Sequence, residues 1–449
     1  MNFDFDLFVL GGGSGGVRAA RVAASELGAK VGIAEGSRYG GTCVIRGCIP
    51  KKLMFFASEA RTNIEEAKGY CWSTGSARFS WNKFQKKLSA ELDRLEHVYL
   101  NLLTDSGVKT FNHFGRIVGP QKIELSNGQS FTARYILIAT GGLPQIPTIE
   151  GLEHTITSNE IFQLEELPIS ILIIGGGYIA CELAGILNGL GVKTTQYYRG
   201  ERILKGFDNE ASELISSAMI ENGIDLKLNL NITKIEKTPE GLCVTDSVGR
   251  SRIFECVLFA TGRKANTSRL IDPKLNLTLG ESGEILVDSY SQTKIPSIFA
   301  IGDVTNRVNL TPVAIHEAMA FVDTVFRNIP RKVDHEMIPT AIFCQPEFGT
   351  VGLSEVDARE LGPIEIYATN TRAMRQQFAE IHEKSLLKLV VCAKTRKILG
   401  CHIVAKQAGE LIQLMGTVLK LGATKEELDA TMAVHPTLAE ELVTMGKPR

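Results

Sequence analysis

Apolar residues in this chain gather in short runs that end at small-residue turns, with segments of mixed polar and apolar spacing between them. Residues 7–10, 135–138, 171–174 and 256–259 are such runs. Runs of this length are typical of strands buried on both faces of a parallel sheet, and the segments between them suit the helices that cover it. From about residue 337 the pattern changes to strands with short helices. The pattern predicts an α/β region followed by a separate α+β domain.

The first apolar run leads into a glycine turn of the spacing GxGxxG. Its members are Gly11, Gly13 and Gly16. A helix and a second strand are expected next, and that strand ends in Glu35. In a dinucleotide-binding fold the glycines let the backbone approach a pyrophosphate, and the acid accepts a hydrogen bond from a ribose 2′-hydroxyl. The order of these features predicts a first dinucleotide site.

A second fold of the same kind begins with residues 171–174. The fingerprint is repeated by Gly175, Gly177 and Ala180. The strand expected at residues 193–198 does not end in an acid. The basic residues that follow it are Arg199, Arg202 and Lys205. Cations at this place accommodate the 2′-phosphate of NADP, whereas an acid favours NAD. The second site is therefore predicted to bind NADPH.

Two cysteines, Cys43 and Cys48, lie close together just after the first fingerprint. A helix expected from Thr42 to about residue 63 would place Cys48 near a helix N-terminus, which favours a thiolate. Most of the other cysteines are expected to be buried thiols; they are Cys71, Cys181, Cys243, Cys256, Cys344, Cys392 and Cys401. A flavin in the first site could lie beside the pair. We therefore hypothesise a redox-active disulfide that passes electrons from a flavin to a disulfide substrate.

Two further segments carry candidate chemistry. Asp303 follows an apolar strand, and Thr311 and Pro312 are expected as the N-cap and first residue of a helix. A helix start beside a flavin stabilises the negative charge of the reduced ring. Near the end of the sequence, His435 has a carboxylate, Glu440, five residues on.

The charge balance limits the classes of partner. Lys and Arg number 49 and Asp and Glu 50, for a formal net charge of -1. This leaves no overall field for nucleic acid or an anionic membrane surface. The start of the sequence has acids where an export signal needs basic residues, and the apolar runs are far shorter than a span of about 20 residues. We expect a soluble, cytoplasmic protein.

Several motifs occur together: GGTCVIRGCIPK at residues 40–51, the two fingerprints, ATG at 139–141, GD at 302–303 and HPTLAE at 435–440. With them the chain resembles the pyridine-nucleotide disulfide oxidoreductases over essentially its full length, and it is most similar to the glutathione reductases. The resemblance implies two Rossmann-like domains, the second inserted in the first, and a C-terminal α+β domain that forms a homodimer. The expected boundaries are 1–142 and 266–336 for the FAD-binding parts, 143–265 for NADPH and 337–449 for dimerisation.

The resemblance also implies a reaction. NADPH would pass electrons through FAD to the Cys43–Cys48 disulfide, which would reduce glutathione disulfide to two glutathione molecules. Cys48 would be the charge-transfer thiolate beside the flavin, and Cys43 would attack the substrate. The partner subunit's His435, oriented by Glu440, would protonate the leaving thiol, since free imidazole titrates near physiological pH.

Further residues are implied to hold the cofactors. Lys51 would pair with Glu182 beside the flavin, and Tyr178 would cover the nicotinamide pocket. Implied FAD contacts are Gly11, Gly13, Ser14, Gly16, Glu35, Thr42, Thr140, Gly141, Asp303 and Thr311. Implied NADPH contacts are Gly175, Gly177, Tyr178, Ala180, Arg199, Arg202, Lys205 and Gly262. No metal site is predicted.

Four residues are candidate contacts for glutathione disulfide: Ser14, Arg21, Arg46 and Tyr99. Arg21 suits a substrate carboxylate and argues against a cationic trypanothione. Met319 departs from the pattern, because several glutathione reductases have an arginine there. We hypothesise that Arg46, which lies in the cysteine loop, partly replaces the missing charge.

Three other functions compete with this interpretation. Dihydrolipoamide dehydrogenase shares the fold, the disulfide and the histidine but normally uses NAD. The basic residues Arg199, Arg202 and Lys205 favour NADP and so argue against this function. The substrate could also be another small disulfide; mercuric and large thioredoxin reductases add C-terminal redox residues that residues 445–449 do not carry. A flavin-binding redox sensor without turnover could dispense with the cysteine pair or with His435, and both are present.

Overall fold

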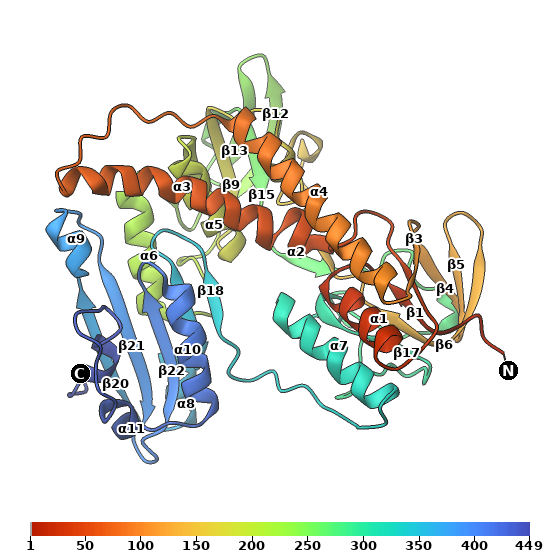
Figure 1. The fold of residues 1–449 in the computed structure, drawn as a ribbon. Coiled ribbons are helices and arrows are strands. Elements are labelled where there is room, and N and C mark those ends of the chain that lie inside the picture. Colours follow the sequence, from red (N-terminus) through yellow and green to blue (C-terminus); the bar gives the residue numbers. More distant parts are fainter. Residues whose placement is uncertain (1) are drawn as a thin grey trace. The chain divides into compact units, whose positions relative to one another are not determined.

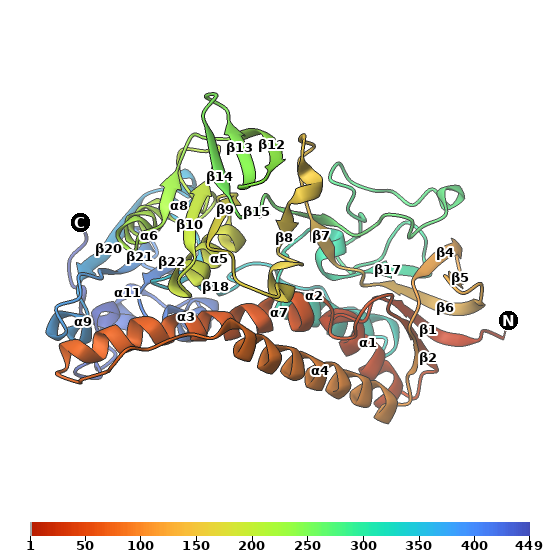
Figure 2. The same cartoon turned by 90° about the horizontal axis from the view of Figure 1, so that it is seen from above.

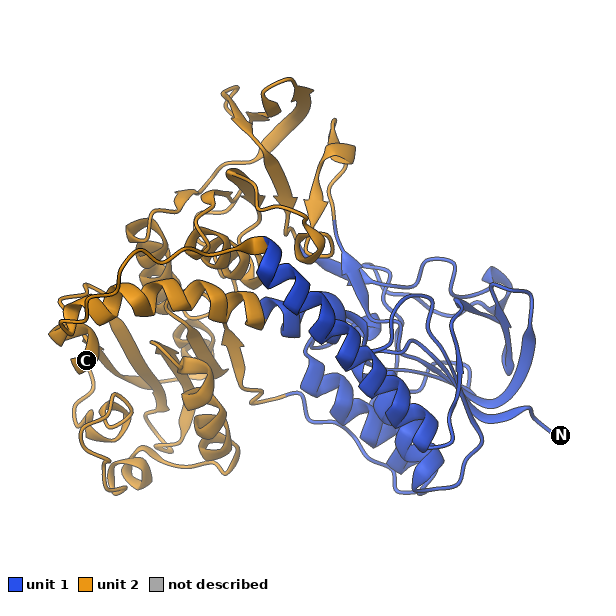
Figure 3. Cartoon of the chain, turned by 45° about the horizontal axis from the view of Figure 1, so that its top comes forward, with its two compact units in different colours: residues 1–51, 82–145, 262–335 blue, residues 52–81, 146–261, 336–449 orange. Residues whose placement is uncertain are grey.

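A computed structural model describes residues 2–449. The chain divides into two compact units, each assembled from segments that are far apart in the sequence (Figure 3). Unit 1 comprises the residues up to 51 together with 82–145 and 262–335, and unit 2 comprises 52–81, 146–261 and 336–449. The chain therefore leaves unit 1 and returns to it twice.

Unit 1 is built on a seven-stranded sheet with the order β3-β2-β1-β6-β5-β4, in which β17 also pairs with β6 (Figures 1 and 2). The strands are β1 (Phe5–Leu10), β2 (Val31–Ala34), β3 (Lys109–Phe111), β4 (Gly115–Gly119), β5 (Lys122–Leu125), β6 (Ser130–Ile138) and β17 (Ile298–Ala300). β1 runs parallel to β2 and β6, whereas β4, β5 and β6 form antiparallel pairs. The predicted buried strands at residues 7–10 and 135–138 are confirmed.

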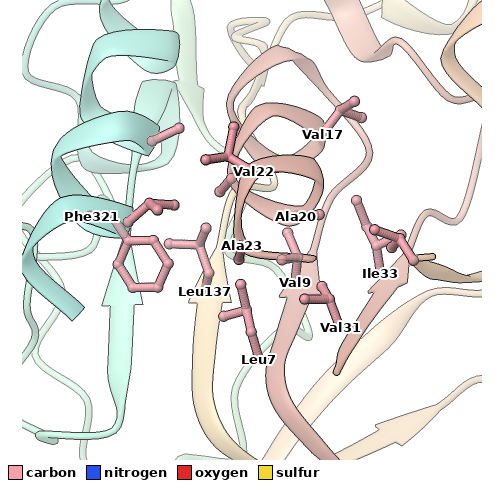
Figure 4. Packing of buried hydrophobic residues seen from close by; sticks show 14 of the residues in the cluster. Leu7, Val9, Val17, Ala20, Val22, Ala23, Val31, Ile33, Leu137 and Phe321 are labelled. Carbon is pink, nitrogen blue, oxygen red and sulfur yellow. The ribbon is translucent and has the colours of Figure 1, made fainter. Parts of the chain in front are cut away.

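The core of unit 1 follows from the alternation of side chains along β1. Leu7 and Val9 point to one face, which α1 (Ser14–Ser25) and α7 (Thr311–Val325) cover, and Phe8 and Leu10 pack on the other. Figure 4 shows Phe321 of α7 and the valines and alanines of α1 packed against these strands. Each large aliphatic side chain buried in this way contributes about 1.5–3 kcal/mol. The packing fixes where α1 and α7 begin, and both helices begin at candidate site residues.

Two local predictions in unit 1 are wrong. The helix expected from residue 42 to about 63 is two helices, α2 (Gly41–Arg46) and α3 (Cys48–Gly69). Gly47 separates them with φ -150° and ψ -115°, and a Cβ there would lie 2.7 Å from the carbonyl oxygen of Thr42. α7 has Leu310 as its N-cap, so Thr311 is its first helical residue. The extended backbone of Leu310 moves the helix start back by one residue, which leaves the Thr311 hydroxyl available for another contact.

Three more elements complete the regular part of unit 1. They are the long helix α4 (Trp81–Asp105), whose Trp81 lies in unit 2, and the strand pair β7 (Gly142–Pro144) and β16 (Arg263–Ala265). The turn predicted at Asn127 and Gly128 joins β5 to β6.

Unit 2 contains the second parallel sheet, with the order β11-β10-β9-β15-β8. Its strands are β8 (Ile156–Thr157), β9 (Ser170–Ile174), β10 (Lys193–Tyr197), β11 (Asp225–Lys227) and β15 (Cys256–Phe259). Helix α5 (Tyr178–Gly189) follows β9 and α6 (Asn209–Glu221) follows β10. A three-stranded antiparallel sheet adjoins them in the chain, formed by β12 (Ile232–Thr238), β13 (Gly241–Asp246) and β14 (Ser251–Phe254). The predicted repeat of the dinucleotide fold is thus present in unit 2.

The C-terminal part of unit 2 is an antiparallel sheet with short helices, as the pattern predicts. Its strands are β18 (Thr340–Ile342), β19 (Phe348–Gly352), β20 (Ile364–Thr371), β21 (Ser385–Cys392) and β22 (Ile398–Val404), in the order β18-β19-β22-β21-β20. Its helices are α8 (Glu355–Leu361), α9 (Met374–Phe378), α10 (Ala408–Lys420), α11 (Lys425–Asp429) and α12 (Glu441–Thr444). Ile412, Met415 and Leu419 of α10 pack on the sheet.

Two expectations about the surface can be compared with the structure. Within residues 2–449, no helix has the length and apolar character needed to cross a membrane. Cys181, Cys344 and Cys401 are buried, but Cys71 is exposed, so the prediction of a buried thiol is wrong for that residue. Cys71 follows the end of α3, in a turn with φ 66°.

Candidate active site

The cysteine pair lies in unit 1, at the first turns of three helices. Cys43 is in the first turn of α2, Cys48 is the first residue of α3, and Thr311 is the first residue of α7. The Sγ atom of Cys48 lies 3.7 Å from Oγ1 of Thr311, and the Cys43 thiol forms hydrogen bonds with both of these residues. Two helix N-termini, each with a partial positive charge, thus converge on the sulfurs and favour a negative charge there.

The Cys43 thiol holds its proton firmly. The pKa of the Cys43 thiol is raised, because Cys43 shares a hydrogen bond with Cys48 and because the thiol is partly buried. Cys48 is exposed at the start of its helix. Cys43 therefore needs a base before it can attack.

The first glycine turn has the geometry of a phosphate cradle. Gly11 has φ 111°, and a Cβ there would lie 2.2 Å from the carbonyl oxygen of Ala139. Gly13 is the N-cap of α1, and no side chain caps the backbone N–H groups at the start of this helix. Glu35 accepts a hydrogen bond from the Gly12 N–H at 2.7 Å, which holds its carboxylate across the turn. These features fit a dinucleotide with its pyrophosphate at the helix start and a ribose at the acid.

Four other predicted FAD residues also lie in unit 1. Thr140 donates from Oγ1 to the carbonyl of Asn266 at 2.8 Å, and Gly141 has φ 70°. Asp303 lies in a 3₁₀ turn (Gly302–Thr305), and burial raises the pKa of its carboxyl. Thr42 is half-buried in α2. These residues are placed to offer hydroxyl, amide and carboxyl groups to a polar chain.

Glu317 of α7 is a buried residue that sequence reasoning missed. Its carboxylate accepts from the Gly302 N–H at 2.6 Å and pairs with Arg307 at 2.8 Å and with His335 at 2.7 Å. Because Gly302 precedes Asp303, Glu317 holds the turn that presents Asp303. The sequence signal was weak, because Glu317 is one of two acids in a largely apolar helix.

Three of the four predicted substrate residues are linked through Tyr99, which also lies within electrostatic range of Cys43. Burial raises the pKa of Tyr99, the nearby Cys43 raises it further, and a hydrogen bond with Ser14 and the charge of Arg21 oppose these effects. Tyr99 therefore lies within electrostatic range of Ser14, Arg21 and the attacking thiol. A hydroxyl pair and a cation beside a thiol suit a polar disulfide with carboxylate groups.

The fourth substrate residue, Arg46, makes a different contact. Its guanidinium donates to Oγ of Ser37 at 3.1 Å. Met319 instead accepts a hydrogen bond from Nε of Arg18 at 3.2 Å. Arg18 lies one turn before Arg21 on α1 and was missed, because its partner is 301 positions away in the sequence.

The second glycine turn, in unit 2, repeats the geometry of the first. Gly175 has φ 144°, and a Cβ there would lie 2.2 Å from the carbonyl oxygen of Ala260. Gly177 is the N-cap of α5; a Cβ there would point into open space among residues 2–449. Tyr178 begins α5 with an exposed ring, and Ala180 is buried. The turn fits a second dinucleotide. Gly262, with φ 120°, belongs to unit 1.

The basic residues predicted for NADPH lie on the segment between β10 and α6, residues 199–207, here called the basic loop. Arg199 and Lys205 are exposed, and Arg202 lies 3.9 Å from a carboxylate oxygen of Glu213. The Leu204 N–H donates to the carbonyl of Gly176 at 2.7 Å, which ties the basic loop to the second glycine turn. Cations are thus available beside the turn.

Two predicted catalytic pairs complete the set. Nδ1 of His435 lies 3.2 Å from both carboxylate oxygens of Glu440, and the histidine side chain is 81% exposed. Glu440 therefore fixes the ring, and Nε2 is presented outward. Glu182 is buried and accepts from the Phe343 N–H at 2.9 Å, while its pairing with Lys51 stays a prediction.

Comparison with known families places these sites in context. The family model described as pyridine nucleotide-disulphide oxidoreductase matches residues 5–318, and that of the dimerisation domain of the same family matches 338–446. The chain belongs to the pyridine nucleotide-disulphide oxidoreductases. The predicted family and fold class are confirmed, and the second match supports the predicted homodimer. The residue roles and the domain boundaries stay predictions.

Curated relatives of this oxidoreductase include three named glutathione reductase. That of Burkholderia cepacia is 46% identical over 448 residues, covering 100% of this chain and 99% of the relative. That of Nostoc sp. is 44% identical, covering 99% and 100%. The glutathione reductase of Pisum sativum, described as chloroplastic/mitochondrial, is 41% identical, covering 99% of this chain and 83% of the relative. These relatives confirm the predicted similarity to glutathione reductases.

Proposed function

We propose that this protein is a homodimeric glutathione reductase, which uses FAD and NADPH to convert glutathione disulfide into two glutathione molecules. The observation that carries the proposal is the grouping of Ser14, Arg21 and Tyr99 with Cys43. In this group Arg21 would bind a carboxylate of the substrate, and Cys43 would attack its disulfide. The three curated relatives named glutathione reductase support the same activity.

The thiol chemistry follows from the two sulfurs. When bound, FAD supplies the route by which two electrons from NADPH reach the Cys43–Cys48 disulfide. In the dithiol, Cys43 gives its proton to the imidazole of the partner subunit's His435 and attacks one sulfur of glutathione disulfide. The first glutathione leaves as a thiolate and takes the proton from that imidazolium. Cys48 then attacks the Cys43 sulfur of the mixed disulfide, releases the second glutathione thiolate, which takes a proton from solvent, and restores the disulfide.

The cofactor residues have separate tasks in this scheme. Gly11, Gly13 and Glu35 would hold the adenosine part of FAD, and Asp303 and Thr311 would face its ring-bearing end. In unit 2, Gly175 and Gly177 would receive the pyrophosphate of NADPH. The cations of the basic loop would bind its 2′-phosphate, which speaks against dihydrolipoamide dehydrogenase. We further propose a cytoplasmic location, since a reducing compartment suits a dithiol enzyme with other free cysteines.

Steady-state NADPH oxidation by the purified flavoprotein tests the proposal. We expect rapid turnover with glutathione disulfide and NADPH, and slow turnover when oxidised lipoamide or NADH replaces one of them. Turnover only with lipoamide and NADH would overturn the proposed substrates while leaving the thiol chemistry intact. NADPH binding without turnover on any disulfide would favour a redox sensor instead.

Arg18, whose guanidinium contacts Met319, leads to a separate prediction. Arg18 and Arg21 lie three residues apart and share one helix face, so both are placed to meet substrate carboxylates. A hydrogen bond to a charged group is worth about 1.5–3 kcal/mol, so Arg18→Ala is expected to raise the KM for glutathione disulfide about tenfold or more. The KM for NADPH should not change.

Arg46→Ala tests the other candidate for the missing charge, whose guanidinium donates to Ser37. If Arg46 partly replaces that charge, as hypothesised, this variant should also raise the KM for glutathione disulfide. A raised KM in Arg46→Ala, together with a normal one in Arg18→Ala, would return the missing charge to Arg46.

A further inference from the structure

The basic loop ends at a buried ion pair. Asp208 directly follows the loop and is the N-cap of α6, where it accepts from the Ala211 N–H. Its two carboxylate oxygens lie 3.2 and 3.0 Å from Nζ of Lys388. Asp208 and Lys388 are each 1% exposed. Lys388 lies on β21, in the C-terminal sheet of unit 2, and 180 positions from Asp208 in the sequence.

Lys388 is surrounded by carboxylates that have other partners as well. Its Nζ lies 3.2 Å from Glu210 and 2.7 Å from Glu355. Glu210 is also paired with Arg449, and Glu355 with Arg359. Burial opposes the charge on Lys388, but Glu355 and Asp208 outweigh it and the pKa of Lys388 is raised. Lys388 therefore remains a cation that holds Asp208.

Three contacts hold the second half of the basic loop, from Leu204 to its end. At Leu204 the backbone is bonded to Gly176 of the glycine turn. At Phe207 the ring packs edge-on against Phe348 of β19, with 5.8 Å between the ring centres. At Asp208 the chain is held to Lys388. Lys205, with its exposed ammonium, lies between the first contact and the other two, so its position depends on both.

We propose that Lys388 is a positioning residue for the selection of NADPH. Through Asp208 it fixes the end of the basic loop, so that the cations of the loop are held ready for the 2′-phosphate. The inference rests on the proposed binding of NADPH by this loop. Preorganised cations bind a phosphate without a further loss of loop entropy, so loosening the loop should weaken binding of the phosphate in particular.

The double variant Asp208→Asn with Lys388→Met removes the pair without leaving either charge unpaired. Glu210 and Glu355 keep Arg449 and Arg359, and asparagine still caps α6. Binding of adenosine 2′,5′-bisphosphate and of 5′-AMP to the flavoprotein is measured by calorimetry. We expect a loss of about tenfold for the bisphosphate and unchanged binding of 5′-AMP, as for residues that act through another group. Asp208→Asn alone gives the same comparison if the double variant does not fold.

Three comparisons make the result decisive. Arg359→Ala removes an exposed partner of Glu355 and should leave both affinities unchanged. In steady state, the preference for NADPH over NADH should fall with the bisphosphate affinity, while the KM for glutathione disulfide stays constant. Unchanged bisphosphate binding in a folded variant, or an equal loss for 5′-AMP, would overturn the positioning role.

The triple variant Arg199→Ala, Arg202→Ala, Lys205→Ala and the single variants Lys205→Ala and Arg199→Ala separate this inference from the proposed function. If they weaken bisphosphate binding and the double variant does not, only the role of Lys388 fails. If none of them weakens it, the basic loop does not bind the 2′-phosphate, and both ideas fail together.

Discussion

The substitution Cys43→Ser or Cys48→Ser is expected to abolish the reduction of glutathione disulfide. Each sulfur forms or breaks a bond in every cycle, and loss of a nucleophile commonly costs a factor of about 10⁴ or more. Electrons from NADPH need only reach the flavin to reduce ferricyanide or a quinone. Both variants should therefore retain NADPH-dependent reduction of these acceptors while kcat with glutathione disulfide falls to background.

Cys71→Ser is the matched control, because Cys71 is an exposed cysteine of the same chain. It should have normal activity with glutathione disulfide. Substantial disulfide turnover by Cys43→Ser or Cys48→Ser would contradict the dithiol mechanism. Loss of activity with ferricyanide as well would indicate that the substitution had disturbed the flavin site instead, which absorbance of the bound flavin would show.

His435→Ala is expected to lower kcat with glutathione disulfide by about 10²- to 10⁴-fold, the usual effect of losing a general acid–base. The pKa of Cys43 is raised, so its thiol needs a base before it can attack. The departing glutathione thiolate in turn needs an acid. Glu440→Gln, which leaves the imidazole in place but weakens its orientation, should have a smaller effect. His154→Ala removes another histidine near a glutamate, at 3.6 Å from Glu153, and should be neutral.

Coexpression of His435→Ala with Cys43→Ser tests whether the histidine comes from the partner subunit. In a mixed two-fold dimer, one site would combine an intact cysteine pair with an intact histidine. Random pairing then restores about one quarter of wild-type sites in the whole mixture, and about one half in the purified mixed dimers. If the histidine acted within its own chain, every site in the mixture would be defective. Recovery of activity, measured on mixed dimers purified through two different tags, therefore distinguishes the two arrangements.

Features that depend on local spacing can be predicted from the residues alone. Glycines are required where the backbone turns with positive φ against a neighbouring strand, as at Gly11 and Gly175, so the two dinucleotide turns are visible in the residues alone. The cysteine pair, the histidine with its glutamate five residues on, and the absence of an acid after the strand at 193–198 are equally local. They were sufficient for the family and the fold class.

Helix boundaries depended on finer geometry. The sequence did not show that Gly47 divides one expected helix into two, because glycine is also tolerated inside helices at modest cost. The close approach of the Gly47 backbone to Thr42 decides the break and places Cys48 at the start of α3. The same holds for Thr311, which the extended backbone of Leu310 places inside α7 rather than at its cap.

The contacts between side chains that are distant in the sequence follow from the folded chain and not from any local pattern. Arg18 contacts Met319, which is 301 positions away in the sequence. Lys388 holds Asp208, which is 180 positions away. No local pattern links either pair. Lys388 stands inside the apolar strand SLLKLVVC, where a sequence pattern predicts an uncharged residue. A buried ammonium is stable there because folding surrounds it with carboxylates from other segments, and that compensation exists only in the folded chain.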